Sequence, residues 1–243
     1  MFCQQAGACW PRKETRMTGR PRSGAERLTR GGIVAAAVEL ADTEGLGALS
    51  MRSVAQQLSV TPMSLYNHVA NKEELLDGMV DAVFAEFYAP APGAEWHSEL
   101  RRRALTAREA LKRHPWAVGL MDSRRNAGYE TLLHHDAVIG CLREAGFSLA
   151  LTGHAFAVLD AHLYGFLIQE VSMPFEPGQD LAELGHQIMA ALPEGQLPYF
   201  REFTLEHALQ PGYDFGDEFE VGLELILDGL AQRLASTDRE RAS

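Results

Sequence analysis

The stretch that decides the fold is residues 50–76, SMRSVAQQLSVTPMSLYNHVANKEELL. Ser50 is a favoured helix N-cap, and Val54, Ala55 and Leu58 after it fall on one face of a helix. A short helix is therefore expected to begin directly after Ser50. Two further helix starts follow within the stretch, which therefore predicts a helix-turn-helix and the helix after it.

The second helix is expected over about residues 62–69. Thr61 is expected to cap it, and Pro62 suits the first turn because a helix leaves that N–H unbonded in any case. Leu65 and Val69, four residues apart, are expected to face inward. A solvated helix face is normally rich in Glu and Lys, whereas the remaining side chains here offer a thioether, a phenol, an amide, an imidazole and a hydroxyl. Such groups suit base edges and phosphates, which indicates a helix that enters the major groove of DNA.

A third helix is expected to begin after Asn71, which is another N-cap residue, and to end near Tyr88, before PAPG at 90–93. Lys72 lies at its N-terminus, where the cation and the helix dipole together favour an anion such as a DNA phosphate. The alternative interpretation is that these three helices only pack against one another and do not bind DNA, because short capped helices also occur in ordinary bundles.

The run 49–76, with LTRGGIVAAAVELADTEG before it, resembles the DNA-binding domain of the tetracycline-repressor (TetR) family. The family's Leu-Tyr-x-His-Val-x-x-Lys pattern is matched from Leu65 to Lys72. Resemblance and expected exposure together give the candidate DNA contacts, among which Asn67 and Met63 are assigned to base edges. The candidates are Arg52, Thr61, Pro62, Met63, Ser64, Tyr66, Asn67, His68 and Lys72.

The rest of the chain resembles the C-terminal domain of tetracycline repressors. The matching segments are YETL at 129–132, GFSL at 146–149 and FEVGLELILDGL at 219–230. The resemblance implies a homodimeric, ligand-responsive regulator, by family default a repressor, that reads a palindromic operator. The alternative is a constitutive helix-turn-helix DNA-binding or architectural protein without an effector, and the large aromatic body argues against it.

The charge is distributed unevenly along the 243 residues, whose net charge is −11. Through Lys72 there are 9 Lys and Arg against 5 Asp and Glu, a net charge of +4; the remainder has 13 against 28, a net charge of −15. A basic end can meet phosphates while an acidic remainder is repelled by them, as expected for a DNA-binding domain on a body that does not bind DNA.

The expected fold class is all-α, because helical patterns follow one another without a β-alternating run. Further helices are expected over about 26–44, 95–113, 115–122, 127–145, 148–173, 179–192, 198–209 and 214–236. The expected units are a disordered basic arm (1–24), a helix-turn-helix domain that we call the head (25–72), a connector helix and linker (73–92), and a ligand-binding and dimerisation domain that we call the body (93–243). Met17 is an alternative start.

Two stripes on expected helices are candidates for a dimer interface. Small residues recur every fourth position over 153–165, and the last helix carries a glycine on its apolar side. Alone, such a stripe occurs more often inside a chain's own core; the resemblance implies instead a four-helix bundle across a two-fold axis. The residues are Gly153, Ala157, Ala161, Gly165, Gly222, Ile226 and Leu230.

The body is also rich in aromatic residues with sparse polar groups, which suits a small hydrophobic or aromatic effector with one or two hydrogen-bonding features. Most of these rings are expected to be core, and a minority to line a cavity. The candidates are Phe84, Phe87, Tyr88, Trp116, Tyr129, His134, Phe156 and Tyr164.

Enzymatic, metal and cofactor chemistry are not expected. The sequence contains no GxSxG, HExxH, P-loop or GxGxxG in context. His154 and His162 are two helical turns, about 12 Å, apart and so too far for one ion. An ungapped count from YETL places Gly119 where the resemblance implies a magnesium-binding histidine, which disfavours magnesium-tetracycline.

A cytoplasmic location without a membrane span is expected. Charge, Gly or His interrupts each apolar run before the 18 or so residues that cross a bilayer, and no secretory pattern opens the chain. Cys3, Cys9 and Cys141 lack CxxC spacing and are expected to be reduced.

Overall fold

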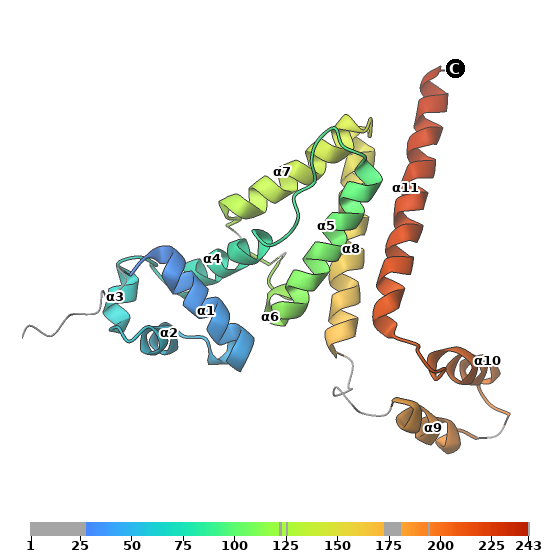
Figure 1. Cartoon of the computed structure of the whole chain (residues 1–243), viewed down its shortest axis with the longest axis horizontal. Helices are drawn as coiled ribbons and strands as arrows, with labels where there is room; N and C mark the ends of the chain where they lie inside the picture. The colour runs from blue at the N-terminus through green and yellow to red at the C-terminus, as the bar shows by residue number, and fades with distance from the viewer. Residues whose placement is uncertain (1–27, 122, 125, 173–180, 194, 243) are drawn as a thin grey trace, which may run out of the picture.

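The structure is a computed structural model that describes residues 28–121, 123–124, 126–172, 181–193 and 195–242. The described residues form helices joined by turns, with no strand among them, so the all-α prediction is confirmed. The head lies at one end of the molecule and the C-terminal helix at the other (Figure 1). The expected basic arm, residues 1–24, lies outside the described residues.

Two helices of the head and connector begin at capping residues that the sequence predicts. The Ser50 side chain accepts from the Ser53 N–H, and the Ser53 side chain accepts from the Ser50 N–H, which closes a capping box. The Asn71 side chain accepts from the Glu74 N–H and so caps the connector helix. The elements are α1 (Arg30–Glu44), a 3₁₀ turn (Leu46–Ala48), α2 (Met51–Gln57), α3 (Pro62–Tyr66) and α4 (Lys72–Phe84).

The second helix of the helix-turn-helix is shorter than expected, since α3 ends at Tyr66 rather than near Val69. Thr61 stands at its N-cap position, but its side chain makes no capping hydrogen bond, so that part of the prediction is wrong. The Thr61 hydroxyl pairs instead with the Ser64 hydroxyl at 2.9 Å. With five residues, α3 is held in place mainly by Leu65, which is fully buried.

The connector helix α4 contributes to two hydrophobic cores. Leu75 and Met79 belong to the cluster that also contains the buried side chains of α1 and α2. Val83 and Phe84 belong to the cluster that fills the body. The change from one cluster to the other takes place between Met79 and Val80, inside one uninterrupted helix.

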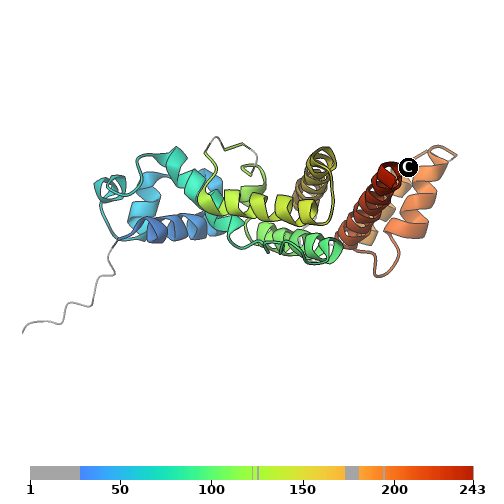
Figure 2. The same ribbon diagram turned by 90° about the horizontal axis from the view of Figure 1, so that it is seen from above.

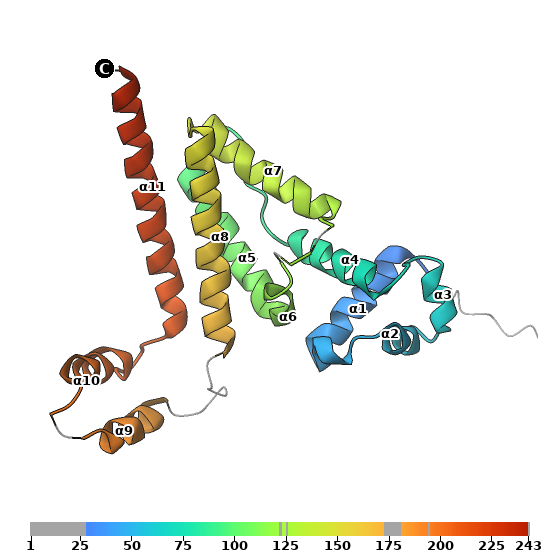
Figure 3. The same ribbon diagram turned by 180° about the vertical axis from the view of Figure 1, so that it is seen from behind.

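The body is a set of long helices around one core. α8 packs against α5, α7 and α11, and α4 packs against α7 (Figures 1 and 2). α9 and α10 lie beyond the adjoining ends of α8 and α11, away from the head (Figure 3). The elements are α5 (Trp96–Arg113), α6 (Pro115–Val118), α7 (Tyr129–Glu144), α8 (Leu149–Ser172), α9 (Leu181–Ala191), α10 (Pro198–Phe203), a π-helical turn (Thr204–Ala208), a 3₁₀ turn (Phe215–Asp217) and α11 (Glu218–Ala242).

Among the described residues, α8 has the length and composition of a membrane-crossing helix, with a mean hydropathy of 1.2 over its most apolar window. The interruptions by Gly and His that we expected to exclude such a helix lower its hydropathy too little to do so. Only 33% of that window is buried, although the helix packs against α5, α6, α7 and α11. A large part of its apolar surface is therefore uncovered within one chain.

Candidate DNA-binding and effector sites

The candidate DNA contacts form an exposed surface around α3. Met63 is 72% exposed and Tyr66 is 47% exposed, although both have large apolar parts. Asn67 and His68 are also exposed, and Ser64 is half-buried. Exposed Arg52, at the start of α2, and exposed Lys72, at the start of α4, flank them along the chain. No described residue of the head covers this mixture of polar and apolar groups, as a surface that meets base edges and phosphates requires.

Lys72 has a contact that the sequence did not indicate. Its Nζ donates to the backbone oxygen of Leu49 at 2.7 Å, and thus joins the start of α4 to the turn before α2. The residue remains exposed, so the ammonium can still face an anion. Lys72 therefore stabilises the packing of the head in addition to placing a positive charge at its surface.

The aromatic candidates for the effector site do not all come together. Phe84 and Phe87 on the connector contact each other at 5.1 Å between ring centroids, and both contact His134, at 5.7 and 5.5 Å. Phe156 reaches this group through His135, with centroids 5.2 Å apart. Four candidates thus share one region at the meeting of α4, α7 and α8.

The other four candidates differ from these in burial and in hydrogen-bond partners. Tyr129 is 72% exposed at the start of α7, and Tyr164 is buried in the core on α8. The Tyr88 hydroxyl donates to Glu99 Oε2 at 2.8 Å, and this bond is the main reason why the pKa of Tyr88 is raised. The Trp116 Nε1–H donates to Asp42 at 2.6 Å.

A cavity of about 190 Å³ lies between α4, α7 and the segment that joins α6 to α7. Arg124 Nε donates to Asp77 Oδ1 at 2.6 Å, and its Nη2 donates to Glu73 Oε2 at 2.8 Å. None of the eight effector candidates expected from the sequence lines this cavity. Asp77 and Asp81, four apart on an amphipathic helix, were the available signal. The lining residues are Asp77, Val80, Met121, Arg124, Asn126, Ala127, Gly128, Thr131 and His135.

Asp81 fixes the start of α7 against α4. Its Oδ1 accepts from the Thr131 N–H at 2.8 Å and from the Thr131 hydroxyl at 3.0 Å. A Cβ at Gly128 would lie 2.1 Å from the Asp81 carboxyl carbon, so any larger residue there would displace the Asp81 carboxylate from Thr131. Together with the Arg124 bonds, this attachment holds one side of the cavity to the connector helix.

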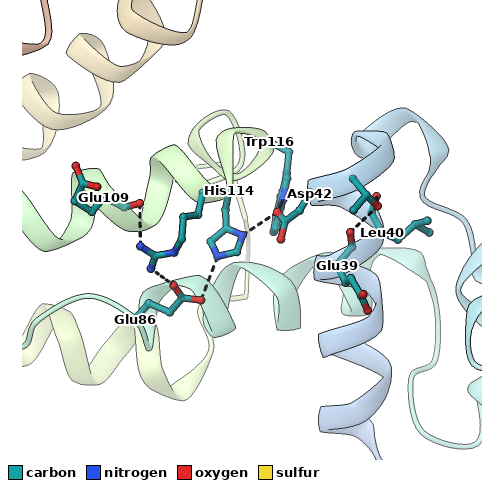
Figure 4. A network of polar contacts seen from close by, with 9 residues as sticks. Glu39, Leu40, Asp42, Glu86, Glu109, His114 and Trp116 are labelled. Atoms are coloured by element: carbon teal, nitrogen blue, oxygen red, sulfur yellow. Dashed lines mark hydrogen bonds and ion pairs between the residues drawn. The ribbon is translucent and has the colours of Figure 1, made fainter. Parts of the chain in front are cut away.

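The head and body also meet at His114, which follows α5 (Figure 4). Its Nδ1 lies 2.8 Å from Asp42 Oδ1 on α1, and its Nε2 lies 3.1 Å from Glu86 Oε1 after α4. Trp116 donates to the same Asp42 oxygen, and Arg113 donates to Glu86. One buried imidazole therefore bridges carboxylates of the head and the connector.

A buried arginine lies next to the aromatic region. Arg103 is 1% exposed; its Nε donates to His134 Nε2 at 3.1 Å, and its Nη2 donates to Asp160 Oδ1 at 2.6 Å. Burial, and secondly the charge of Arg103, lower the pKa of His134 to about 3. This pair could not be read from helix periodicity, because it joins helices far apart in the sequence.

The candidate interface residues divide between the surface and the chain's own core. Gly153, Ala157 and Ala161 are exposed on α8, and Gly165 and Ile226 are half-buried. Leu230 is 7% exposed within the body core, and a Cβ at Gly222 would lie 2.6 Å from the ring of His162 in the same chain. A groove of about 470 Å³ lies between α8 and α11. Its lining is Leu151, His154, Val158, Leu225, Ile226, Gly229, Leu230 and Arg233.

The described part of the chain contains no cluster of three or more His, Cys, Asp or Glu side chains able to hold a metal ion. Cys141, on α7, is buried, and desolvation raises the pKa of its thiol to about 11. A thiol in this state is a packing group rather than a nucleophile.

Comparison with known proteins gives matches to both parts of the chain. Residues 33–79 match the sequence model of bacterial regulatory proteins of the tetR family, and residues 89–234 match that of the tetracyclin repressor-like C-terminal domain. An HTH-type transcriptional regulator of Saccharopolyspora erythraea is 36% identical over 165 residues, 68% of each chain. The HTH-type transcriptional repressor DrrR1 of Streptomyces coeruleorubidus is 31% identical over 224 residues, which cover 88% of this chain and 82% of DrrR1.

Solved structures give the same result for the fold. The TetR family protein ActR of Streptomyces coelicolor, in complex with actinorhodin, is similar with a TM-score of 0.73 at 27% identity. The similarity covers 86% of this chain and 99% of that one. The two relatives are named as a transcriptional regulator and a transcriptional repressor.

Proposed function

Because the chain belongs to the tetracycline-repressor family of bacterial transcriptional regulators, we propose that it binds a palindromic operator as a homodimer and is released by a small aromatic effector. The exposed surface around α3 is the observation that carries this proposal. We place the protein in the cytoplasm, where the operator DNA is.

The assignment of DNA contacts rests on exposure and chemistry. Asn67 is exposed and can donate to and accept from an adenine edge, and Met63 offers an apolar contact for a thymine methyl group. Tyr66 and Arg52 are also exposed and are assigned to phosphates, together with Lys72. In the proposed complex α3 lies in the major groove and the other two helix starts face the backbone.

The homodimer is supported by the uncovered apolar surface of α8 and α11. Leu149 is 75% exposed, Leu225 is 70% exposed, and the exposed small residues of α8 allow close approach of another helix. A second copy on this surface pairs α8 and α11 with their mates across a two-fold axis. Two-fold symmetry in turn matches a palindrome with half-sites spaced by whole helical turns.

The effector is proposed to act through α4. The bonds of Asp77 to Arg124 and of Asp81 to Thr131 attach this helix to the body, beside the cavity of about 190 Å³. A molecule that enlarges the cavity shifts α4 and with it the head. When the distance between the two heads no longer matches the spacing of successive major grooves, both heads cannot dock at once, and operator affinity falls.

The test is operator binding by the full-length dimer. Selection from random-sequence and genomic duplexes should recover a palindrome, and light scattering should give twice the chain mass. Aromatic compounds that raise the melting temperature should then dissociate the operator complex. Recovery of a palindrome that no stabilising compound dissociates would favour a constitutive DNA-binding protein, and no specific duplex at all would refute the proposal.

A further inference from the structure

His134, on α7, is a buried histidine whose tautomer is set by its neighbour. Arg103 Nε lies 3.1 Å from His134 Nε2, and a guanidinium nitrogen can only donate. His134 Nε2 therefore accepts and carries no proton. Because the pKa of His134 is lowered to about 3, the ring is neutral near pH 7. Its single proton is consequently on Nδ1.

The Nδ1–H of His134 is a buried donor that has no hydrogen-bond partner among the described residues. The residue is only 3% exposed. Buried polar groups in folded proteins are nearly always hydrogen-bonded, because an unpaired one has lost water without replacement. A donor in this condition, inside a proposed effector domain, indicates that a bound molecule supplies the acceptor.

The surroundings of this donor are aromatic. Phe84, Phe87 and His135 lie with ring centroids 5.7, 5.5 and 6.5 Å from that of His134. His135 also lines the cavity between α4 and α7, and its ring packs edge-on against Phe84 at 5.6 Å. The His135 ring thus belongs both to the cavity wall and to the surroundings of His134. Apolar walls with one oriented polar group are the usual composition of a small-molecule site.

The charge next to His134 is already neutralised. Arg103 Nη2 donates to Asp160 Oδ1 at 2.6 Å, and the Asp160 side chain is only 13% exposed. An anionic group on the ligand would therefore meet a buried carboxylate as well as the guanidinium. A neutral acceptor satisfies the Nδ1–H without this conflict.

We propose that His134 determines the specificity of the effector site, and that its Nδ1–H selects a neutral, planar aromatic molecule bearing a carbonyl oxygen. The carbonyl accepts from Nδ1–H, and the flat skeleton displaces the His135 ring and lies against Phe84 and Phe87. This inference rests on the proposed function of the body as an effector domain, and it assigns the chemical class of the effector.

Xanthone and xanthene test it, because they share one tricyclic skeleton and differ in a carbonyl that xanthene replaces by a methylene. Full-length protein is titrated with each, using tryptophan fluorescence and thermal shift. Xanthone should bind at least about tenfold more tightly, since xanthene leaves the donor unpaired. The His134→Gln variant can accept from Arg103 and still offer an N–H, and should keep this preference. The His134→Leu variant should bind the two compounds within about twofold of each other.

Equal affinities in the wild type, binding of neither compound, or a retained preference in His134→Leu would overturn the proposal. If His134→Leu fails to fold, nitrogen-15 spectra of the histidine-labelled wild type decide: xanthone should shift the Nδ1 resonance of His134, and a proton on Nε2 contradicts the assignment. Operator binding is measured separately. Operator binding without discrimination between the compounds refutes this inference alone, whereas discrimination without operator binding refutes only the proposed repression.

Discussion

The contact between head and body at His114 gives a quantitative test of what holds the two units together. His114 Nδ1 is 2.8 Å from Asp42 Oδ1, and the two side chains are 9% and 26% exposed. Hydrogen bonds to charged groups contribute about 1.5–3 kcal/mol. Because part of Asp42 faces water, we expect a coupling of about 1–2 kcal/mol between the two side chains.

A double-mutant cycle measures this coupling. Asp42→Ala, His114→Ala and the double variant are unfolded in urea at one protein concentration, because association also stabilises a dimer. Arg30 and Glu74 serve as the control cycle, since their charges are 3.5 Å apart but their side chains are 53% and 39% exposed. The control should give less than about 0.5 kcal/mol. A His114–Asp42 coupling no larger than the control would refute the conclusion that this contact fastens the head.

Three further predictions concern DNA, dimer and pH. Asn67→Ala should change base preference, whereas Lys72→Ala should weaken binding to all duplexes, reduce the salt slope by about one and, through loss of its bond to Leu49, lower the melting temperature. Ala161→Glu should give monomers in light scattering, because it places an unpaired charge on the exposed stripe of α8. Because the pKa of His134 falls from 6.5 to about 3 on folding, the unfolded chain binds the extra proton; urea unfolding should show stability falling as pH drops from about 6.5 towards 3.

Each of these predictions has a contrary outcome. Equal, sequence-independent losses from the Asn67 and Lys72 variants would contradict the division between base and phosphate contacts. A dimeric Ala161→Glu protein with normal operator affinity would show that the dimer interface does not include this stripe. Ala85→Glu, at an exposed position after α4, controls for the effect of an added charge. His134→Leu should show a shallower loss of stability over the same pH range, and an unchanged slope would mean that His134 does not cause it.

The head could be predicted because its signals are local. Ser50 and Asn71 cap helices through residues three positions away, and the spacing of Val54, Ala55 and Leu65 fixes which faces are buried. Such patterns act within one or two helical turns, and are visible in a single sequence. The Thr61 cap failed for an equally local reason, since Ser64 competes for its hydroxyl.

For the effector region, the sequence predicted the chemical character of the pocket but not which helices form it. Aromatic content indicated that a pocket exists, but the partners of Arg103 and Arg124 lie up to 57 residues away in the chain. Helix periodicity gives the face of each residue and not the helix that it meets. Tyr129 shows this limit, because its ring is aromatic and follows the pattern of the candidates, yet no described helix covers it and it is 72% exposed.

The passage of α4 from one core to the other limits how this protein can be recombined with its relatives. At about 1.5 Å per residue the 13 residues of α4 form a rod about 20 Å long, without a proline or other break that could act as a joint. A chimera cut before Lys72 would deprive the grafted head of Leu75 and Met79, and one cut after Phe84 would deprive the recipient body of Val83 and Phe84. Exchange of operator specificity should therefore succeed by replacing the exposed residues of α3 within an intact chain, and fail when whole heads are transplanted.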